Sequence, residues 1–285
     1  MHRPIDLHAH TTHSDGSLTP TELVDLAAEV GLAALALTDH DTTGGLPEAR
    51  AAAERHGIEV LAGCEITAGV PAGVAHVLAY AFDEEHDAFQ GLLSEVRAGR
   101  DERNDRIHAK LEKLGVPVSE EDVRKHAVGC IVARPHFAMA MVDRGHVDTM
   151  RQAFDHYLRD RGPAYARAPV PSAEEAIGQV VAAGGVAVLA HPRSLKLGGE
   201  QAYREAFTRM RDAGLVGLEV DHPSQDAKLR RQFGALADEL GLERSGGSDF
   251  HGAHKPGIAL GTGNGTIAVT YATWARLLAR AGSAA

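Results

Sequence analysis

The chain has 285 residues and a mass of 30.1 kDa, enough for one large domain or two ordinary ones. Its 44% hydrophobic and 24% charged residues exclude a disordered or fibrous protein. With 29 basic and 39 acidic side chains the formal net charge is −10. A surface for duplex nucleic acid is therefore not expected, because neutralising phosphates requires clustered Lys and Arg. Small phosphorylated substrates remain possible, since metal ions can supply the positive charge.

The two cysteines, Cys64 and Cys130, are too few for a disulfide framework or a four-cysteine zinc site, and we expect reduced thiols. Residues 1–6 contain no apolar signal core, and no stretch reaches the ~18 apolar residues of a membrane span. These features predict a cytoplasmic protein without membrane association. No partner protein is indicated.

The first 82 residues alternate short apolar runs with amphipathic helical segments. Thr19-Pro20-Thr21-Glu22 combines an N-cap, a proline at the first helical position and a capping-box glutamate, which predicts a helix from there to about Val30. Gly31 then ends it. The other elements expected here are strands at 5–8, 35–38, 58–62 and 74–81 and a helix at 47–56.

Residues 83–162 have a different residue pattern: they are rich in charged residues, favour helices and contain no convincing strand. Helices are expected at 84–114, 119–126, 134–143 and 148–161. We interpret this segment as an all-α insertion into a domain formed by residues 1–82 and 163–285. Alternation resumes after it, with strands at 186–190, 216–220 and 243–248 and helices at 172–183, 200–213, 224–240 and 271–281. This order predicts an α/β protein with a parallel, barrel-like sheet.

Nearly every expected strand ends in, or carries, side chains that bind metal ions. In a β/α barrel the carboxyl ends of the parallel strands share one face, so these side chains should converge. In His8-Ala9-His10 and Asp249-Phe250-His251 the two-residue period of an extended chain points both outer side chains the same way. The candidate ligands are His8, His10, Asp15, His40, Glu65, His76, His191, Asp249 and His251. Nitrogen and oxygen donors without thiolate suit zinc, manganese or iron, and this set exceeds the needs of one ion.

These segments resemble the PHP (polymerase and histidinol phosphatase) superfamily of metal-dependent phosphoesterases. The matching motifs are Asp6-Leu7-His8-Ala9-His10 with Ser14-Asp15-Gly16, Thr38-Asp39-His40-Asp41, Gly63-Cys64-Glu65, His76, Ala190-His191-Pro192 and Ser248-Asp249-Phe250-His251. The resemblance covers the segments outside the helical insertion. It implies a distorted seven-stranded β/α barrel with a trinuclear site.

The resemblance also implies how the ligands are divided. One ion would be held by His8, His10, Glu65 and Asp249, a second by Glu65, His76 and His191, and a third by Asp15, His40 and His251. Glu65 would bridge two ions through its two oxygens, and we assign catalytic roles to Glu65, His191 and Asp249. We expect two to three divalent ions per chain. The oxygen of Asp15 favours manganese, although zinc or iron would accept this ligand set.

A barrel without a flanking polymerase region, opening with Asp-Leu-His-x-His-(x)4-Asp-Gly, resembles the bacterial nucleotide phosphoesterases of this superfamily. Members of that branch remove the 3′-phosphate from 3′,5′-bisphosphonucleotides, and some trim short RNA from its 5′ end. Two alternatives stay open. One is a phosphatase for histidinol phosphate or another alcohol monophosphate, although that branch usually has histidine where Asp15 stands. The other is a non-catalytic, metal-binding regulatory barrel, against which the intact ligand set argues.

In such a site a hydroxide that bridges two ions would attack the phosphorus at neutral pH. Arg134 and His136, in a segment that also resembles the nucleotide branch, are candidates for gripping a substrate phosphate, and the insertion would cover the metal face. The other interpretation is a capping or surface arginine beside a packing histidine. Further candidates are Arg193, Lys196 and His222. The acid for the leaving group would be His222, His13 or a metal-bound water.

Overall fold

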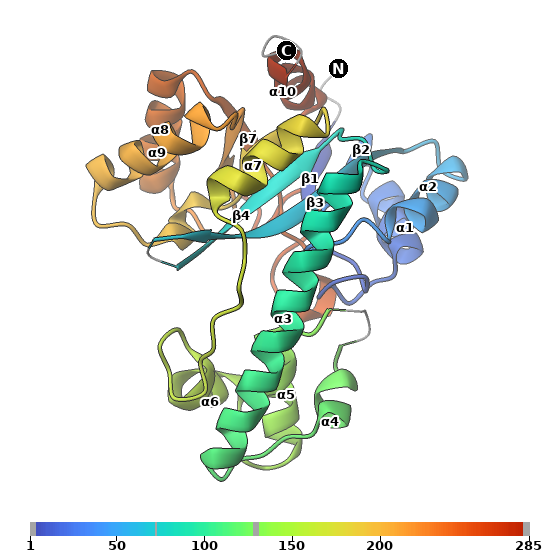
Figure 1. Ribbon diagram of the computed structural model, residues 1–285. Helices are drawn as coiled ribbons and strands as arrows, with labels where there is room; N and C mark the ends of the chain where they lie inside the picture. The colour runs from blue at the N-terminus through green and yellow to red at the C-terminus, as the bar shows by residue number, and fades with distance from the viewer. Residues whose placement is uncertain (1–3, 72, 128–130, 282–285) are drawn as a thin grey trace. The chain divides into compact units, whose positions relative to one another are not determined.

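The computed structural model describes residues 4–71, 73–127 and 131–281 (Figure 1). These residues form two compact units. The first consists of the described residues up to Leu93 and from Pro171 onward, and the second runs from Ser94 to Val170. Cys130 and the first three residues lie outside the described residues. Cys64, the other cysteine, is a buried free thiol.

In the described part of the first unit, seven strands form one sheet in sequence order. They are β1 (Ile5–Ala9), β2 (Ala34–Leu37), β3 (Glu59–Val70), β4 (Gly73–Tyr80), β5 (Val186–Leu189), β6 (Gly217–Asp221) and β7 (Glu243–Gly246). The chain beyond β7 returns to β1, where Ala9 bridges Phe250 and the His10 N–H donates to the Phe250 carbonyl at 2.9 Å. The sheet therefore curls on itself, which confirms the predicted α/β class and distorted barrel.

The expectation of an all-parallel sheet is wrong at β4. Strands β1 to β3 pair in parallel, as do β5 to β7, but β4 is antiparallel to both β3 and β5. The strand expected at 58–62 is also too short, because β3 continues to Val70 and pairs with β4 from Gly63 onward. Glu65 and His76 therefore lie within a long hairpin, not at the ends of parallel strands.

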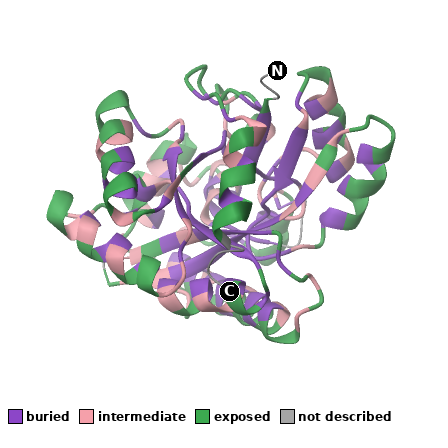
Figure 2. Cartoon of the chain, turned by 90° about the horizontal axis from the view of Figure 1, so that it is seen from above, coloured by how far each residue is buried: buried purple, intermediate pink, exposed green. Residues whose placement is uncertain are grey.

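Helices cover the sheet of the first unit. They are α1 (Pro20–Glu29), α2 (Leu46–Glu54), α7 (Ala173–Ala182), α8 (Glu200–Asp212), α9 (Ala227–Leu240) and α10 (Tyr271–Ala281). The capping box predicted for α1 is present, with Thr19 and Glu22 bonding each other's backbone N–H groups. The strands are almost entirely buried, whereas the helices alternate buried and exposed residues (Figure 2). None of the described helices combines the length and apolarity needed to cross a bilayer.

Alternate residues along a strand point to opposite faces of the sheet and belong to different apolar clusters. On β2, Leu35 and Leu37 pack with residues of α1 and α2, while Ala34 and Ala36 pack in a cluster with Trp274 of α10. A third cluster joins β3 and β4 to α7, α8 and α9. The two-residue period of the strands thus separates the packing on the two faces of the sheet, and this packing holds the strand ends in place.

The second unit is helical over its described residues. It contains the greater part of α3 (Asp87–Lys113), followed by α4 (Glu120–Arg124), α5 (Arg134–Asp143), α6 (Met150–Ala153) and a π-helical turn, η1 (Phe154–Leu158). Ile107, Leu111, Phe137 and Met141 belong to its own apolar core. The helix expected at 148–161 is therefore wrong in its bounds, since α6 begins at Met150 and the π turn ends at Leu158.

Candidate metal centre

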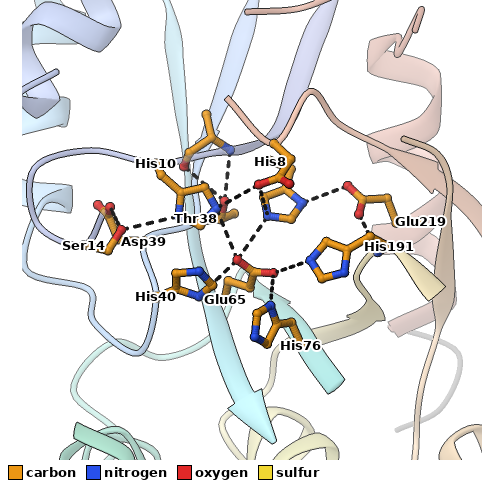
Figure 3. Close-up of polar contacts among 12 residues, drawn as sticks. His8, His10, Ser14, Thr38, Asp39, His40, Glu65, His76, His191 and Glu219 are labelled. Carbon is orange, nitrogen blue, oxygen red and sulfur yellow. Dashed lines mark hydrogen bonds and ion pairs between the residues drawn. The ribbon is translucent and has the colours of Figure 1, made fainter. Parts of the chain in front are cut away.

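The curled sheet of the first unit brings all nine predicted ligands into one cluster, in which six are buried and Asp15, His76 and His191 are partly exposed. β1 supplies His8, the segment after β1 supplies His10, β3 supplies Glu65 and β4 supplies His76. Asp15 also lies in the segment after β1, and His40, His191, Asp249 and His251 follow the ends of β2, β5 and β7. Glu65 lies at the centre, with histidines from four segments of the chain directed toward it (Figure 3).

The carboxylate of Glu65 is 1% exposed and has a different set of imidazoles at each oxygen. Its Oε2 lies 3.2–3.3 Å from three ring nitrogens, and its Oε1 lies 2.9 Å from two. The partners of Oε2 are His8 Nε2, His10 Nε2 and His40 Nδ1, and those of Oε1 are His76 Nδ1 and His191 Nε2. This arrangement suits a carboxylate that is shared between two ions.

Asp15 and Asp249 extend the cluster on either side of His10. Asp15 Oδ1 lies 3.2 Å from His251 Nε2 and 3.7 Å from His10 Nδ1, and its Oδ2 lies 3.9 Å from His40 Nε2. Asp249 Oδ1 lies 3.5 Å from His10 Nε2. The donor atoms of His10, Asp15, His40 and His251 are all within 4.8 Å of one another.

Four buried atoms of the cluster have no hydrogen-bond partner among the described residues. They are His8 Nε2, His10 Nε2, Asp15 Oδ1 and His40 Nδ1. A buried polar atom left unpaired costs about 1–3 kcal/mol, so four that converge on one place require another partner. Imidazole nitrogens and carboxylate oxygens are ligands for zinc, manganese or iron. The residues present therefore fit divalent metal ions.

The cluster keeps its carboxylates ionised despite their burial. Burial opposes the charge on Glu65, but His40, His76 and His8 outweigh it and hold its pKa well below the usual range. The same balance, with Lys255 and His8 as the main partners, lowers the pKa of Asp249. Burial also lowers the pKa of His40, to about 3. For His10 burial acts in the same direction, but hydrogen bonds to Asp249 and Glu65 outweigh it and raise its pKa to about 9. The cluster thus presents anionic oxygens, which suit cations.

Two of the proposed catalytic residues have strained backbones. The φ angle is 28° at His191 and 55° at Asp249, a region that residues other than glycine rarely adopt and that costs about 1–3 kcal/mol. Hydrogen bonds hold both in place. The His191 N–H donates to Glu219 Oε2 at 2.7 Å, and the Asp249 N–H donates to the His8 carbonyl at 2.8 Å. Such strain is typical of functional sites.

Other charged residues at strand ends have structural partners instead. Asp39 accepts hydrogen bonds from the Thr11 N–H at 2.7 Å and from the Ser14 hydroxyl at 2.6 Å, and so fixes the loop that carries Asp15. Asp41 accepts from the N–H of Thr67 at 2.6 Å.

Two residues of the site were not predicted from the sequence. Glu219, on β6, lies 2.9 Å from His8 Nδ1. A charged residue in the middle of the apolar strand Gly-Leu-Glu-Val-Asp is the signal that could have indicated it. Lys255 forms an ion pair with Asp249, while its side chain remains 44% exposed. No pattern in the sequence distinguishes Lys255 from other lysines.

The candidate substrate residues fall into both units. In the first unit, His222 Nε2 lies 3.1 Å from Asp249 Oδ2 and its Nδ1 lies 2.8 Å from the Ser224 hydroxyl. Arg193 donates to the Ser224 carbonyl, and Lys196 has a left-handed backbone at φ 50°. His13 is the nearest side chain to Gly44, whose added Cβ would lie 3.1 Å from His13 Nδ1.

Arg134 and His136 belong to the second unit, at the start of α5. Arg134 donates to Asp160 Oδ1 at 2.9 Å and to the Leu158 carbonyl at 3.2 Å. His136 Nδ1 accepts from the Ala133 N–H at 3.0 Å. These contacts match the capping and packing interpretation, and a role toward substrate stays a prediction.

The molecule is an α/β protein whose curled sheet carries a cluster of histidines and carboxylates suited to metal ions. These two features define the class of metal-binding α/β proteins. The profile of the PHP domain family matches residues 6–185, and the chain belongs to this family, which confirms the resemblance seen in its motifs.

Similar proteins cover nearly the whole chain. A 3′,5′-nucleoside bisphosphate phosphatase of Chromobacterium violaceum is 38% identical over 277 residues, 97% of each chain. A 5′-3′ exoribonuclease of Haemophilus influenzae is 37% identical over 251 residues, 88% of this chain and 91% of the relative. The solved structure of a candidate metal-dependent phosphoesterase from Bifidobacterium adolescentis has a TM-score of 0.84 at 33% identity, covering 97% of this chain and 96% of the other.

Proposed function

We propose that this protein is a metal-dependent phosphoesterase that removes the 3′-phosphate of 3′,5′-bisphosphonucleotides and also trims short RNA from its 5′ end. The observation that carries the proposal is Glu65, a buried carboxylate whose two oxygens face five imidazoles from four segments of the chain. Full-length similarity to a bisphosphate phosphatase and to an exoribonuclease supports the substrate class.

The distances around Glu65 support a centre with more than one ion, and for the division of its ligands we adopt the one that the family resemblance implies. Other sets, such as His40 with Glu65 and His76, also lie within 4.8 Å of one another. His8, His10, Glu65 and Asp249 would hold one ion; Glu65, His76 and His191 a second; and Asp15, His40 and His251 a third. When bound, divalent ions would supply Lewis acidity toward a phosphate ester. We propose manganese, with zinc and iron as alternatives.

The chain's own residues have separate proposed tasks. Glu65, His191 and Asp249 are proposed to hold the metal ions in the positions at which the scissile phosphate binds. His222, held between Asp249 and Ser224, is suited to hold a proton at Nε2 for the leaving oxygen. Arg134 and His136 are proposed to grip the second phosphate of the substrate, and the helical segment at 83–162 to cover the metal face.

A phosphate-release panel tests the function. Adenosine 3′,5′-bisphosphate, adenosine monophosphates, short oligoribonucleotides and histidinol phosphate are each incubated with manganese-loaded protein, and Glu65→Gln serves as the matched control. We expect inorganic phosphate and 5′-AMP from the bisphosphate, at a higher kcat/KM than from any monophosphate. Preference for histidinol phosphate would favour the alcohol-monophosphate alternative. A metal-loaded protein inactive on every substrate would favour the regulatory one.

A further inference from the structure

Glu219 connects two members of the metal centre that come from different strands. Its side chain is fully buried, and its two oxygens contact different residues. Oε1 lies 2.9 Å from His8 Nδ1, and Oε2 accepts the backbone N–H of His191 at 2.7 Å. Figure 3 shows Glu219 between these two residues, on the side of both that faces away from Glu65. In the proposed centre, His8 and His191 bind different ions.

We propose that Glu219 is a positioning residue that holds His8 and His191 in their metal-binding geometry and is not itself a metal ligand. This inference rests on the proposed metal centre, because it assigns Glu219 a task toward two of its ligands.

The contact with His8 determines which ring nitrogen is available to a metal ion. A carboxylate accepts hydrogen bonds, so the proton of the neutral ring is placed on Nδ1 and the lone pair on Nε2. Nε2 is the atom directed into the cluster, 3.3 Å from Glu65 Oε2 and 3.6 Å from Asp249 Oδ1. It has no hydrogen-bond partner among the described residues. Carboxylates behind metal-binding imidazoles commonly fix the tautomer and orientation of the ring in this way.

The contact with His191 supports a strained backbone. The φ angle of 28° at His191 turns the chain sharply after β5 and places its Nε2 2.9 Å from Glu65 Oε1. The bond from its N–H to Glu219 stabilises that turn. Glu219 is itself anchored, since the side-chain amide of Gln225 donates to the carbonyls of Glu219 at 3.0 Å and Val220 at 2.7 Å.

A separate ion held by His8, Glu219 and His222 is the competing interpretation, because their donor atoms lie within 4.8 Å of one another. The hydrogen bonds argue against it. Both oxygens of Glu219 are already engaged, and His222 is held by Asp249 at 3.1 Å and by the Ser224 hydroxyl at 2.8 Å. The contacts of Glu219 and His222 are thus satisfied within the protein, whereas His8 Nε2, His10 Nε2 and His40 Nδ1, which face Glu65 Oε2, have no hydrogen-bond partner among the described residues.

The test is the binding of Zn²⁺ to the full-length protein after removal of metals with a chelator. Glu219→Gln keeps the shape but replaces one acceptor oxygen with an NH2 donor. Either the His191 N–H then loses its acceptor, or His8 must accept at Nδ1 and carry its proton on Nε2, the atom that would bind the metal ion. We expect its affinity for two ions to fall about 10- to 100-fold, with unchanged stoichiometry at saturating Zn²⁺. Affinity is measured by competition with a chromophoric chelator and stoichiometry by elemental analysis. Asp122→Asn is the matched control, because Asp122 is a buried carboxylate of the second unit that bonds Ser119 and Arg144.

A second measurement does not depend on the folding of a variant. In the Zn²⁺-loaded wild-type protein, the ring of His8 should show a slowly exchanging proton on Nδ1 in a ¹H–¹⁵N spectrum. A proton on Nε2 instead would overturn the proposal. So would unchanged Zn²⁺ affinity in a folded Glu219→Gln protein, or the loss of one ion with the others bound normally, which would make Glu219 a ligand. Wild-type protein that binds no ion would overturn the metal centre as well, which separates the two failures.

Discussion

Asp6 Oδ1 accepts the backbone N–H of Ser248 at 2.9 Å, which joins the first strand to the segment after the last strand across 242 positions of the chain. The same oxygen accepts the His8 N–H at 3.1 Å, and Oδ2 accepts the Gly261 N–H at 2.7 Å. One buried carboxylate thus ties together the segments that carry His8 and Asp249.

Asp6→Ala should lower the free energy of unfolding by at least about 3 kcal/mol, because three backbone N–H groups lose their acceptor and each unsatisfied group costs about 1–3 kcal/mol. Chemical denaturation of the metal-free protein measures it. Asp6→Asn retains one acceptor oxygen and should lose less. Equal stability of Asp6→Ala and wild type would show that water replaces the carboxylate.

Glu65→Ala should remove the shared ligand and cost both metal content and activity. We expect at least one ion fewer per chain and a decrease in kcat/KM of more than about 100-fold, since changes behind metal ligands already cost 10- to 100-fold. Elemental analysis of protein purified without chelator gives the metal content. At most one ion per wild-type chain would contradict the proposed polynuclear centre.

Gly247→Ala should disturb the site through steric contact alone. A Cβ at Gly247 would lie 2.3 Å from the Cβ of His8, closer than two carbons can approach. We expect a loss of about 1–3 kcal/mol in the free energy of unfolding and weaker metal binding. Gly178→Ala, in α7, is the matched control. Outside the neighbouring residues and the backbone of the helix, no described atom lies within 4 Å of an added Cβ there, so this variant should keep or slightly raise stability. Similar behaviour of the two variants would refute the steric argument.

Arg134→Ala should lower kcat/KM for a 3′,5′-bisphosphonucleotide by about 10- to 100-fold, because a charge-assisted bond to phosphate is worth about 1.5–3 kcal/mol. p-Nitrophenyl phosphate has no second phosphate and should be affected little. Equal losses on both substrates would place Arg134 at the scissile phosphate. If Arg134→Ala lowered the melting temperature without changing kcat/KM, the role of Arg134 would be limited to its contacts with Asp160 and Leu158.

The stability of the second unit should decrease at acidic pH because Asp122 becomes protonated. Hydrogen bonds from Ser119 and Arg144 hold the pKa of Asp122 well below its usual range. A depressed folded-state pKa stabilises the protein above the unfolded value of about 4, and this stabilisation is lost as the pH falls below it. Hydrogen exchange of residues 131–170 should therefore accelerate between about pH 4 and pH 2. In Asp122→Asn the exchange should be faster at pH 7 and depend less on pH, and an unchanged pH dependence would contradict this origin.

The sequence indicated the candidate ligands because their signals are local. His8-Ala9-His10 and Asp249-Phe250-His251 are short motifs in which residue type and spacing already describe a pair of ligands. Helix α1 was equally predictable, since a capping box needs only residues three positions apart.

Only the tertiary structure decided how these residues are used. β4 follows β3 in a hairpin, so its antiparallel direction was accessible from their short connection, although the alternating elements suggested a parallel sheet. Its pairing with β5, which is distant in the chain, depended on the tertiary structure. A buried carboxylate can bind a metal ion, accept backbone N–H groups or orient an imidazole, and its neighbours alone determine which. Asp39 therefore fixes a loop, whereas Glu65 faces five imidazoles and Glu219 contacts His8 and His191. Local residue types determined which ligands the chain offers, and long-range packing decided which atoms they present to a metal ion, because hydrogen-bond partners come from distant strands of the curled sheet.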